Sequence, residues 1–172
     1  EEFWPQTAQT FSLANAAPKT TPLIINEIHY HPPDGAGEVD NTHDEFVELY
    51  NPGTAVDVSG WRLKGDSDFS FPAGSNIAAG AYVLMVSFDP ADSAMLTAFR
   101  EMYGLNAGTP VFGPYSVKLS NSTQNVELAY PGPAVGTETP FINVDKVEYR
   151  DLAPWDVAAD GTGCAPIFST AA

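Results

Sequence analysis

The 172-residue sequence contains only one cysteine and three histidines, and it has no long apolar segment. A single thiol, Cys164, forms neither a disulfide framework nor a paired-thiolate metal site within the chain. No apolar run is long enough to span a bilayer, and no basic segment followed by an apolar one opens the sequence. We therefore expect no membrane insertion. Because the sequence starts at Glu1, we expect a processed product or an excised piece whose export signal lies elsewhere.

Positive charge is also scarce. Seven lysines and arginines stand against 22 aspartates and glutamates, which gives a formal net charge of -15. This charge repels the phosphates of nucleic acids and of anionic lipids, so nucleic acid is not an expected partner. The same acidity suits a secreted or cell-surface protein, and it also suits the binding of divalent cations. Composition does not separate these two interpretations.

The sequence contains enough apolar material for one packed domain, with 44% hydrophobic and 12% aromatic residues. Residues 1–22 are interpreted as an N-terminal extension that ends in a Pro- and Thr-containing linker. Within them, residues 10–13 form either a short strand or the frayed end of a preceding domain. Residues 23–163 are expected to form the domain, and residues 164–172 a C-terminal tail.

Alternating apolar residues predict an all-β fold. The pattern is clearest at residues 44–53, where a strand runs into an Asn-Pro-Gly turn, and the next strand directs Trp61 inward. In the first strand, a period of two places Ile24, Ile28 and Tyr30 on one face, with Ile25, Glu27 and His29 on the other. The predicted strands are 23–30, a strand from 45 to the turn, 61–64, 69–72, 82–86, 117–119, 126–130 and 144–149. Together they predict a β-sandwich.

One short helix is predicted at about residues 90–103. Asp89 is the expected N-cap, Pro90 the first helical residue, and Gly104 the residue that ends the helix. Apolar residues recur at intervals of three and four, so the helix is expected to pack one stripe against the sandwich. These residues are Met95, Leu96, Phe99, Met102 and Tyr103.

Several motifs occur in an order that resembles a known family. They are Ile25-Asn26-Glu27-Ile28, Glu45-Phe46-Val47-Glu48-Leu49-Tyr50-Asn51, Ser59-Gly60-Trp61-Arg62-Leu63, Phe71-Pro72, Ala79-Gly80-Ala81-Tyr82-Val83-Leu84, Leu119-Ser120-Asn121-Ser122, Val126-Glu127-Leu128, Val144-Asp145 and the stretch 147–163. The set resembles the bacterial branch of the lamin tail domain over residues 23–163. The resemblance implies an immunoglobulin-like β-sandwich that acts as a non-catalytic adaptor beside hydrolase, nuclease or kinase-like domains of larger secreted chains.

Two features depart from that family pattern. Where the bacterial pattern continues into a closing strand, this sequence has Cys164-Ala165-Pro166 after Gly163. The final strand is therefore expected to be altered or missing. The predicted helix is an insertion relative to the lamin version of the domain. Neither departure removes the predicted sandwich.

The acidic loop before the second strand is the strongest candidate site. Its oxygen-bearing side chains are dense enough to bind Ca²⁺, although their spacing differs from that of an EF-hand. The Ca²⁺ candidates are Asp34, Glu38, Asp40, Asp44 and Glu45, with Asn41 among them. The alternative is a solvated acidic loop, which is common on acidic proteins. A second acidic patch, residues 66–68, has the same two interpretations.

Other residues suggest chemistry with weaker patterns. The histidines His29, His31 and His43 suggest a zinc site. The alternative is that each ring is unligated and forms local hydrogen bonds. Glu27 and Glu48, on neighbouring strands, suggest an acid–base pair. The alternative is a structural role, in which a carboxylate accepts hydrogen bonds from backbone N–H groups of a loop near Asn51. We favour the structural interpretation in both cases.

Aromatic side chains suggest core positions more than sugar platforms. Trp61 and Trp155 are expected to anchor the core, whereas Trp4 and Tyr115 are less clearly buried. The function expected from the sequence is a non-enzymatic, extracytoplasmic interaction or spacer module of a larger protein, with an unknown protein or polysaccharide partner. The alternatives are a Ca²⁺-dependent binding module, possibly for polysaccharide, and a small metallohydrolase. No cofactor is expected apart from possible Ca²⁺.

Overall fold

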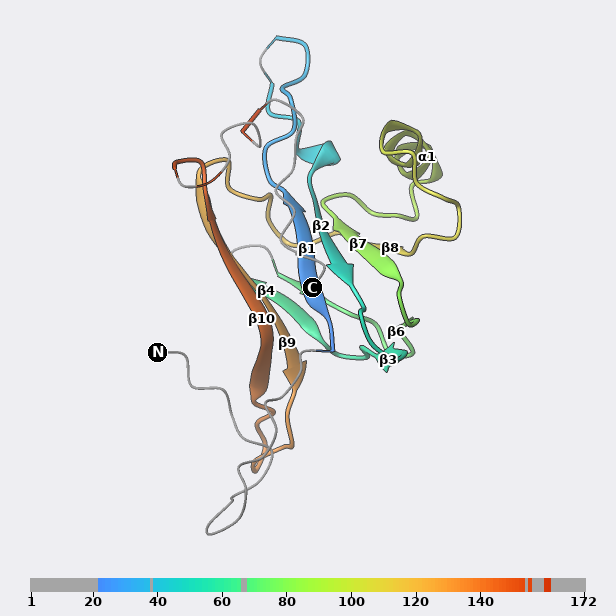
Figure 1. Cartoon of the computed structure of the whole chain (residues 1–172), viewed down its shortest axis with the longest axis vertical. Coiled ribbons are helices and arrows are strands. Elements are labelled where there is room, and N and C mark those ends of the chain that lie inside the picture. The colour runs from blue at the N-terminus through green and yellow to red at the C-terminus, as the bar shows by residue number, and fades with distance from the viewer. Residues whose placement is uncertain (1–21, 38, 66–67, 154, 156–159, 162–172) are drawn as a thin grey trace.

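A computed structural model of the chain describes residues 22–37, 39–65, 68–153, 155 and 160–161 (Figure 1). The described residues form ten strands and one α-helix. The elements are β1 Ile24–His29, β2 Phe46–Tyr50, β3 Val56–Asp57, β4 Arg62–Gly65, β5 Phe69–Ser70, β6 Asn76–Ile77, β7 Tyr82–Val86, α1 Ser93–Met102, β8 Val111–Phe112, β9 Thr123–Pro131 and β10 Phe141–Arg150, with a 3-10 turn at Thr42–Asp44. The all-β prediction with one inserted helix is confirmed.

Two four-stranded sheets face each other across the core. One has the order β1-β2-β7-β8 and the other the order β10-β9-β4-β5, while β3 and β6 form a short third sheet. Only the β7–β8 pairing is parallel among the described strand pairs. At the seam between β1 and β10, the backbone N–H of Ile25 donates to Oδ2 of Asp145 at 2.8 Å. The architecture is an immunoglobulin-like β-sandwich.

The main core lies between the inner faces of the two sheets. Leu49 and Val83 of one sheet meet Leu63 and Leu128 of the other in a single buried cluster. Trp61 joins this cluster with 8% of its surface exposed, and Trp155 packs against its edge. The core role expected for both tryptophans is therefore confirmed. Tyr115 is also buried, so the sequence underestimated its burial.

Strand β1 departs from simple alternation because it contains a bulge. The pairing with β2 shifts between Ile25 and Glu27, so Asn26 is an extra residue in the strand. Ile25 and Ile28 consequently both face the main core, and Ile24 pairs with Tyr50 on the opposite face. The prediction that Ile24 shares a face with Ile28, and Ile25 with Glu27, was wrong for this reason.

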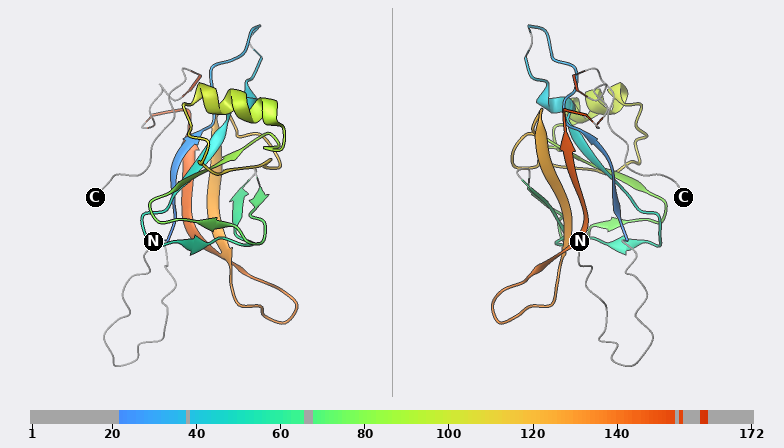
Figure 2. Two further views of the ribbon diagram at one scale, coloured as in Figure 1. Left: turned by 90° about the vertical axis from the view of Figure 1, so that its right-hand side faces the viewer. Right: turned by 60° about the vertical axis from the view of Figure 1, so that its left-hand side comes forward.

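Helix α1 covers one half of the outer face of the β1-β2-β7-β8 sheet (Figure 2). Phe99 packs there with Phe46, Leu84 and Val86 in a second buried cluster, separate from the main core. Among the predicted stripe residues, Met102 is instead 62% exposed. The apolar stripe thus holds α1 on the sheet mostly as predicted.

The helix begins three residues later than predicted. Oδ1 of Asp89 accepts the N–H of Ala91, and its carbonyl accepts the N–H of Asp92, so residues 89–92 form a turn with Pro90 inside it. The N-cap is Asp92, whose carboxylate accepts the N–H groups of Ala94 and Met95. The end was predicted correctly, because Gly104 follows the helix with φ +61°.

Most predicted strands occur, and β7 has the predicted bounds. The predicted strand at residues 117–119 does not form. The N–H of Leu119 donates to a side-chain oxygen, Oε2 of Glu45, instead of to a neighbouring strand, and Val117 is exposed. The sequence also missed the two-residue strands β3, β6 and β8, which are too short to show a period.

Some predictions fall on residues that the structure does not describe. These are residues 1–21 with Trp4 and the segment 10–13, Glu38, Asp66 and Ser67, and residues 162–172 with Cys164. The domain boundaries drawn at residues 22 and 163 stay predictions. Within the described part of the chain, α1 is too short and too polar to cross a membrane.

Candidate functional site

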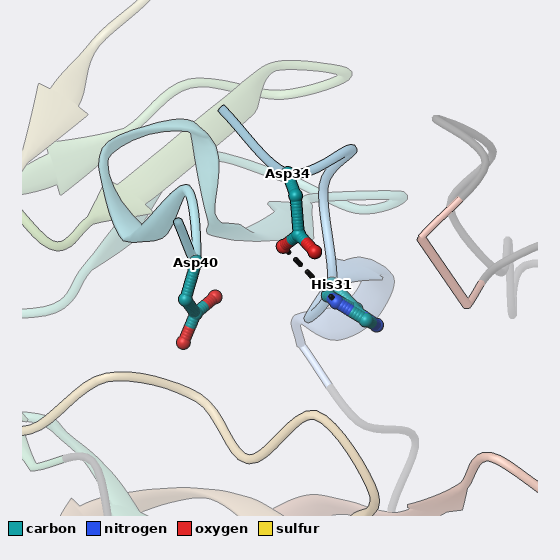
Figure 3. Close-up of side chains that lie close together, drawn as sticks. All are labelled: His31, Asp34 and Asp40. Carbon is teal, nitrogen blue, oxygen red and sulfur yellow. Dashed lines mark ion pairs between the residues drawn. The ribbon is translucent and has the colours of Figure 1, made fainter. Parts of the chain in front are cut away.

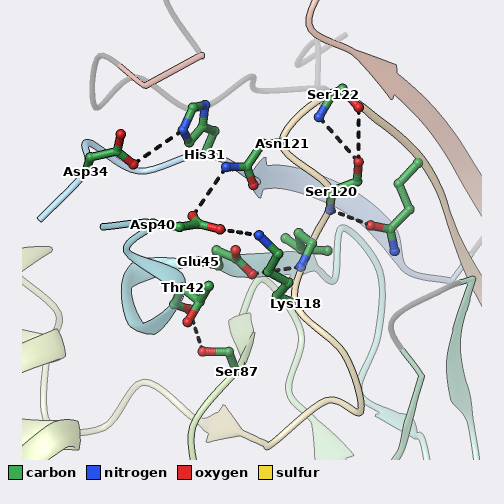
Figure 4. A network of polar contacts seen from close by, with 12 residues as sticks. His31, Asp34, Asp40, Thr42, Glu45, Ser87, Lys118, Ser120, Asn121 and Ser122 are labelled. Carbon is green, nitrogen blue, oxygen red and sulfur yellow. Dashed lines mark hydrogen bonds and ion pairs between the residues drawn. The ribbon is translucent and has the colours of Figure 1, made fainter. Parts of the chain in front are cut away.

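Three loops meet at one end of the sandwich and bring polar side chains together (Figure 4). The acidic loop between β1 and β2 supplies His31, Asp34 and Asp40, and the loop before β9 supplies Lys118 and Asn121. The third segment, residues 160–161, is attached by a backbone hydrogen bond from Gly161 N to the carbonyl of His31 at 3.1 Å. We call this group of side chains the loop cluster.

The loop cluster contains one set of side chains with the spacing of metal ligands. One ligand atom each from His31, Asp34 and Asp40 lies within 4.8 Å of the other two (Figure 3). Nε2 of His31 is 3.7 Å from Oδ1 of Asp34, and its Nδ1 is 2.5 Å from Oδ1 of Asp160. A carboxylate on the far ring nitrogen is the usual orientation of a metal-binding histidine.

Asp40 already has cationic and polar partners. Lys118 forms an ion pair with Oδ2 of Asp40, and Asn121 donates to its Oδ1 at 3.3 Å. Partial burial acts to raise the pKa of Asp40, but the hydrogen bonds from Lys118 and Asn121 outweigh it and keep this pKa below its usual value. A metal ion at this position would therefore compete with the Lys118 ammonium for the same carboxylate.

The remaining predicted Ca²⁺ ligands make other contacts. Asp44 accepts a hydrogen bond from the Asn41 side chain. Glu45 is 0% exposed, and its Oε2 accepts the N–H of Leu119 at 2.8 Å and the hydroxyl of Tyr115 at 3.0 Å. Burial raises the pKa of Glu45 to about 7, although these two hydrogen bonds act to lower it. Of the predicted ligands that the structure describes, only Asp34 and Asp40 meet in a ligand group, and the Ca²⁺ site stays a prediction.

The three histidines do not assemble into one ligand group in the described part of the chain. His29 is buried on the outer face of β1, with its ring centroid 5.3 Å from that of Phe46 and 5.7 Å from that of Tyr103. Burial lowers the pKa of His29 to about 4, which keeps the ring neutral. His43 is exposed in the 3-10 turn. The expected local hydrogen bonding of His29 is observed at one ring nitrogen, where Nδ1 lies 3.3 Å from the Tyr103 hydroxyl, whereas Nε2 has no hydrogen-bond partner among the described residues.

A second polar group lies on the outer face of the β1-β2-β7-β8 sheet. Glu27 and Glu48 lie on neighbouring strands, as predicted, and the structure makes them direct partners across β1 and β2. Nδ2 of Asn26 donates to Oε1 of Glu48 at 2.7 Å. Burial and the neighbouring Glu48 charge raise the pKa of Glu27 to about 7. Burial also raises the pKa of Glu48.

The structural role predicted for this pair was wrong in its partner. Glu48 is held by the Asn26 side chain, and the bulge that brings Asn26 there leaves no signal in the alternating pattern. Asn51 instead organises its own loop, because its Nδ2 donates to the carbonyls of Thr54, Ile77 and Ala78. Of the second acidic patch, only Asp68 lies within the described residues, and it is exposed.

Among the described residues, carboxylates are prominent in both polar groups, and three of the loop-cluster side chains have the spacing of cation ligands. A protein-family model described as Lamin Tail Domain matches residues 16–139. The match ends before β10, yet β10 pairs with β9 along its length, so the sandwich extends beyond the matched region. No curated protein matches the chain.

Proposed function

The chain belongs to the lamin tail domain family, and on that premise we propose that it is a non-catalytic module that acts by binding a partner. The observation that supports this most is the family match itself, because the family is a non-catalytic immunoglobulin-like domain and the match covers well over half of the 172 residues. Among the described residues, Glu45 and His29 have shifted pKa values, and both make structural contacts: Glu45 accepts the N–H of Leu119, and the His29 ring packs against Phe46.

The finer proposal is an extracytoplasmic module within a larger protein. Its net charge of -15 supports a domain that stays soluble and does not bind nucleic acid, which suits an exported adaptor. Its partner is then a protein or a polysaccharide, as the sequence suggested.

A second candidate function is divalent-cation-dependent binding. It is favoured by the approach of His31, Asp34 and Asp40 to within 4.8 Å. The ion pair of Lys118 with Asp40 argues against a tight site. Under this second candidate function, a divalent cation changes the affinity for the partner. Under the first, partner binding is independent of metal.

Turnover assays test the non-catalytic proposal. The purified chain is incubated with ester, phosphodiester and glycoside substrates in the presence of Ca²⁺, Mg²⁺, Mn²⁺ or Zn²⁺. We expect rates equal to those of the blank. Saturable turnover that is lost in His31→Ala or in Glu27→Gln, and retained in the exposed control Glu101→Gln, would contradict the proposal.

A further inference from the structure

The outer face of the β1-β2-β7-β8 sheet is divided into two unlike halves. One half is apolar and lies under α1, where Phe46, Leu84 and Val86 pack against the helix. The other half, which we call the open face, is built by Asn26, Glu27, Glu48, Tyr50 and Tyr82. The pairings place its members side by side, because Glu48 faces Glu27, and Tyr50 faces Tyr82 two residues further along β2.

The open face has an excess of hydrogen-bond acceptors. Two carboxylates are directly opposed across the strands, an arrangement that destabilises a sheet when no cation is present. Asn26 is 6% exposed, and its Oδ1 has no partner among the described residues, although its Nδ2 holds Glu48. Leaving such a buried acceptor without a donor is costly. Because this Oδ1 is itself closed to solvent, a ligand with several donors would reach the two half-buried carboxylates.

The described part of the chain supplies no cation to this face. Its six basic side chains all make contacts elsewhere. Lys118 pairs with Asp40, Lys146 with Glu127 and Arg150 with Glu148, Arg62 and Lys64 lie over the Phe141 ring, and Arg100 donates to the carbonyls of Asn106 and Thr109. A cation that pairs with the open face must therefore come from outside this group.

Two tyrosines add aromatic surface next to the carboxylates. The rings of Tyr50 and Tyr82 stack with centroids 4.6 Å apart and planes 25° from parallel, and Tyr82 is 44% exposed. A guanidinium group can bind both the carboxylates and the aromatic rings of this surface. It donates in a planar fork to carboxylates and it stacks on aromatic rings, whereas an ammonium group is a compact, strongly hydrated charge.

We propose that the open face binds an arginine side chain of a basic partner segment, with Glu27 and Glu48 accepting its N–H groups, Asn26 holding Glu48 in position, and Tyr82 packing against the guanidinium. This proposal rests on the proposed binding function and names the chemistry of the partner. The acidity of the whole chain attracts such a segment over a longer range, and the open face gives it a defined position.

The test is an NMR titration of the ¹⁵N-labelled chain with a blocked tetra-arginine peptide at physiological salt. We expect shift changes at the amides of β1, β2 and β7. The double variant Glu27→Gln with Glu48→Gln should weaken binding about tenfold. Glu101→Gln with Glu138→Gln removes the same charge from two exposed positions and should change the affinity less than about twofold.

A second variant tests the aromatic contact without changing the charge of the open face. Tyr82→Leu keeps an apolar side chain on β7 and should weaken binding about threefold, because it removes the aromatic surface alone. Equal weakening in both double-glutamine variants would show non-specific attraction and would overturn the proposal. Shift changes centred on the loop cluster would overturn it as well. Either result leaves the proposed non-catalytic binding function standing, because that function is tested separately by the turnover assays and a partner can bind elsewhere on the domain.

Discussion

Nδ2 of Asn26 donates to Oε1 of Glu48 across the β1–β2 pairing at 2.7 Å, from the one extra residue that the bulge inserts into β1. This bond turns a strand irregularity into a binding surface. The bond fixes the carboxylate of Glu48, while Glu27 has no ion-pair partner among the described residues. The bulge itself places Ile25 and Ile28 together in the core. A bulge that redirects a side chain is a common device near functional surfaces.

The carboxylate pair predicts an unusual pH dependence of stability. The pKa of Glu27 is raised from 4.5 to about 7, so the folded state binds this proton more tightly than the unfolded state. Glu45 shifts in the same direction. Stability is therefore gained as the pH falls through 7 and lost as it rises. We expect a higher melting temperature at pH 6.5 than at pH 8.

The window stops at pH 6.5 because His29 acts in the opposite direction below it. Its pKa falls from 6.5 to about 4 on folding, so its contribution is lost as the pH drops towards 4. Glu27→Gln should raise the melting temperature at pH 8 and reduce its pH dependence, and the exposed control Glu101→Gln should leave both unchanged. An unaltered pH dependence in Glu27→Gln would refute the assignment.

Glu45 is predicted to stabilise the fold without metal. Glu45→Ala leaves the buried N–H of Leu119 and the Tyr115 hydroxyl without their acceptor. We expect the free energy of unfolding in urea to fall by about 1–3 kcal/mol, equally in EDTA and in Ca²⁺. A loss that appears only in Ca²⁺ would instead make Glu45 a metal ligand.

Trp61 is predicted to be essential to the core. Trp61→Ala should lower the free energy of unfolding by about 3–5 kcal/mol, against a typical domain stability of about 5–15 kcal/mol. Met102→Ala, on the exposed side of α1, should change it little. Thermal and urea unfolding of the two variants check this, and an unchanged melting temperature in Trp61→Ala would contradict the core assignment.

The sequence predicted those parts of the fold that depend on local pattern. Alternation located β7 and most of the longer strands, and Gly104 located the end of α1. It failed where several local choices are equivalent or where a tertiary contact decides. Asp89 and Asp92 are both suitable caps, and Asp92 caps the helix while Asp89 closes the turn before it. Leu119 has the pattern of a strand residue, but Glu45 takes its N–H.

The same limit applies to the candidate sites. The opposition of Glu27 and Glu48 was predictable from neighbouring strands, whereas the contribution of Asn26 depends on a bulge with no sequence signal. In the acidic loop, density of charge was visible in the sequence. Which acids meet was not, because His31 and Lys118 reach Asp34 and Asp40 from positions set by the folded loops.

The loop cluster is predicted to bind divalent cations weakly. Because Lys118 already neutralises Asp40, Ca²⁺ and Mg²⁺ should bind with similar, low affinity in calorimetry at physiological salt. A stoichiometric Ca²⁺ site tighter than about 100 μM, abolished by Asp40→Ala with Asp44→Ala, would establish the cation-dependent function instead.

Site-specific cross-linking in the source cells tests the central claim, that this domain acts by binding a partner on its open face. A photoreactive residue replaces Tyr82 on that face or, as a control, the exposed Val135 in the loop between β9 and β10, which Figure 2 shows extending from the opposite end of the sandwich to the acidic loop. The account predicts a discrete cross-linked product from position 82, absent from position 135 and lost when Glu27→Gln and Glu48→Gln are added. No discrete product at position 82, or the same products from both positions, would contradict it.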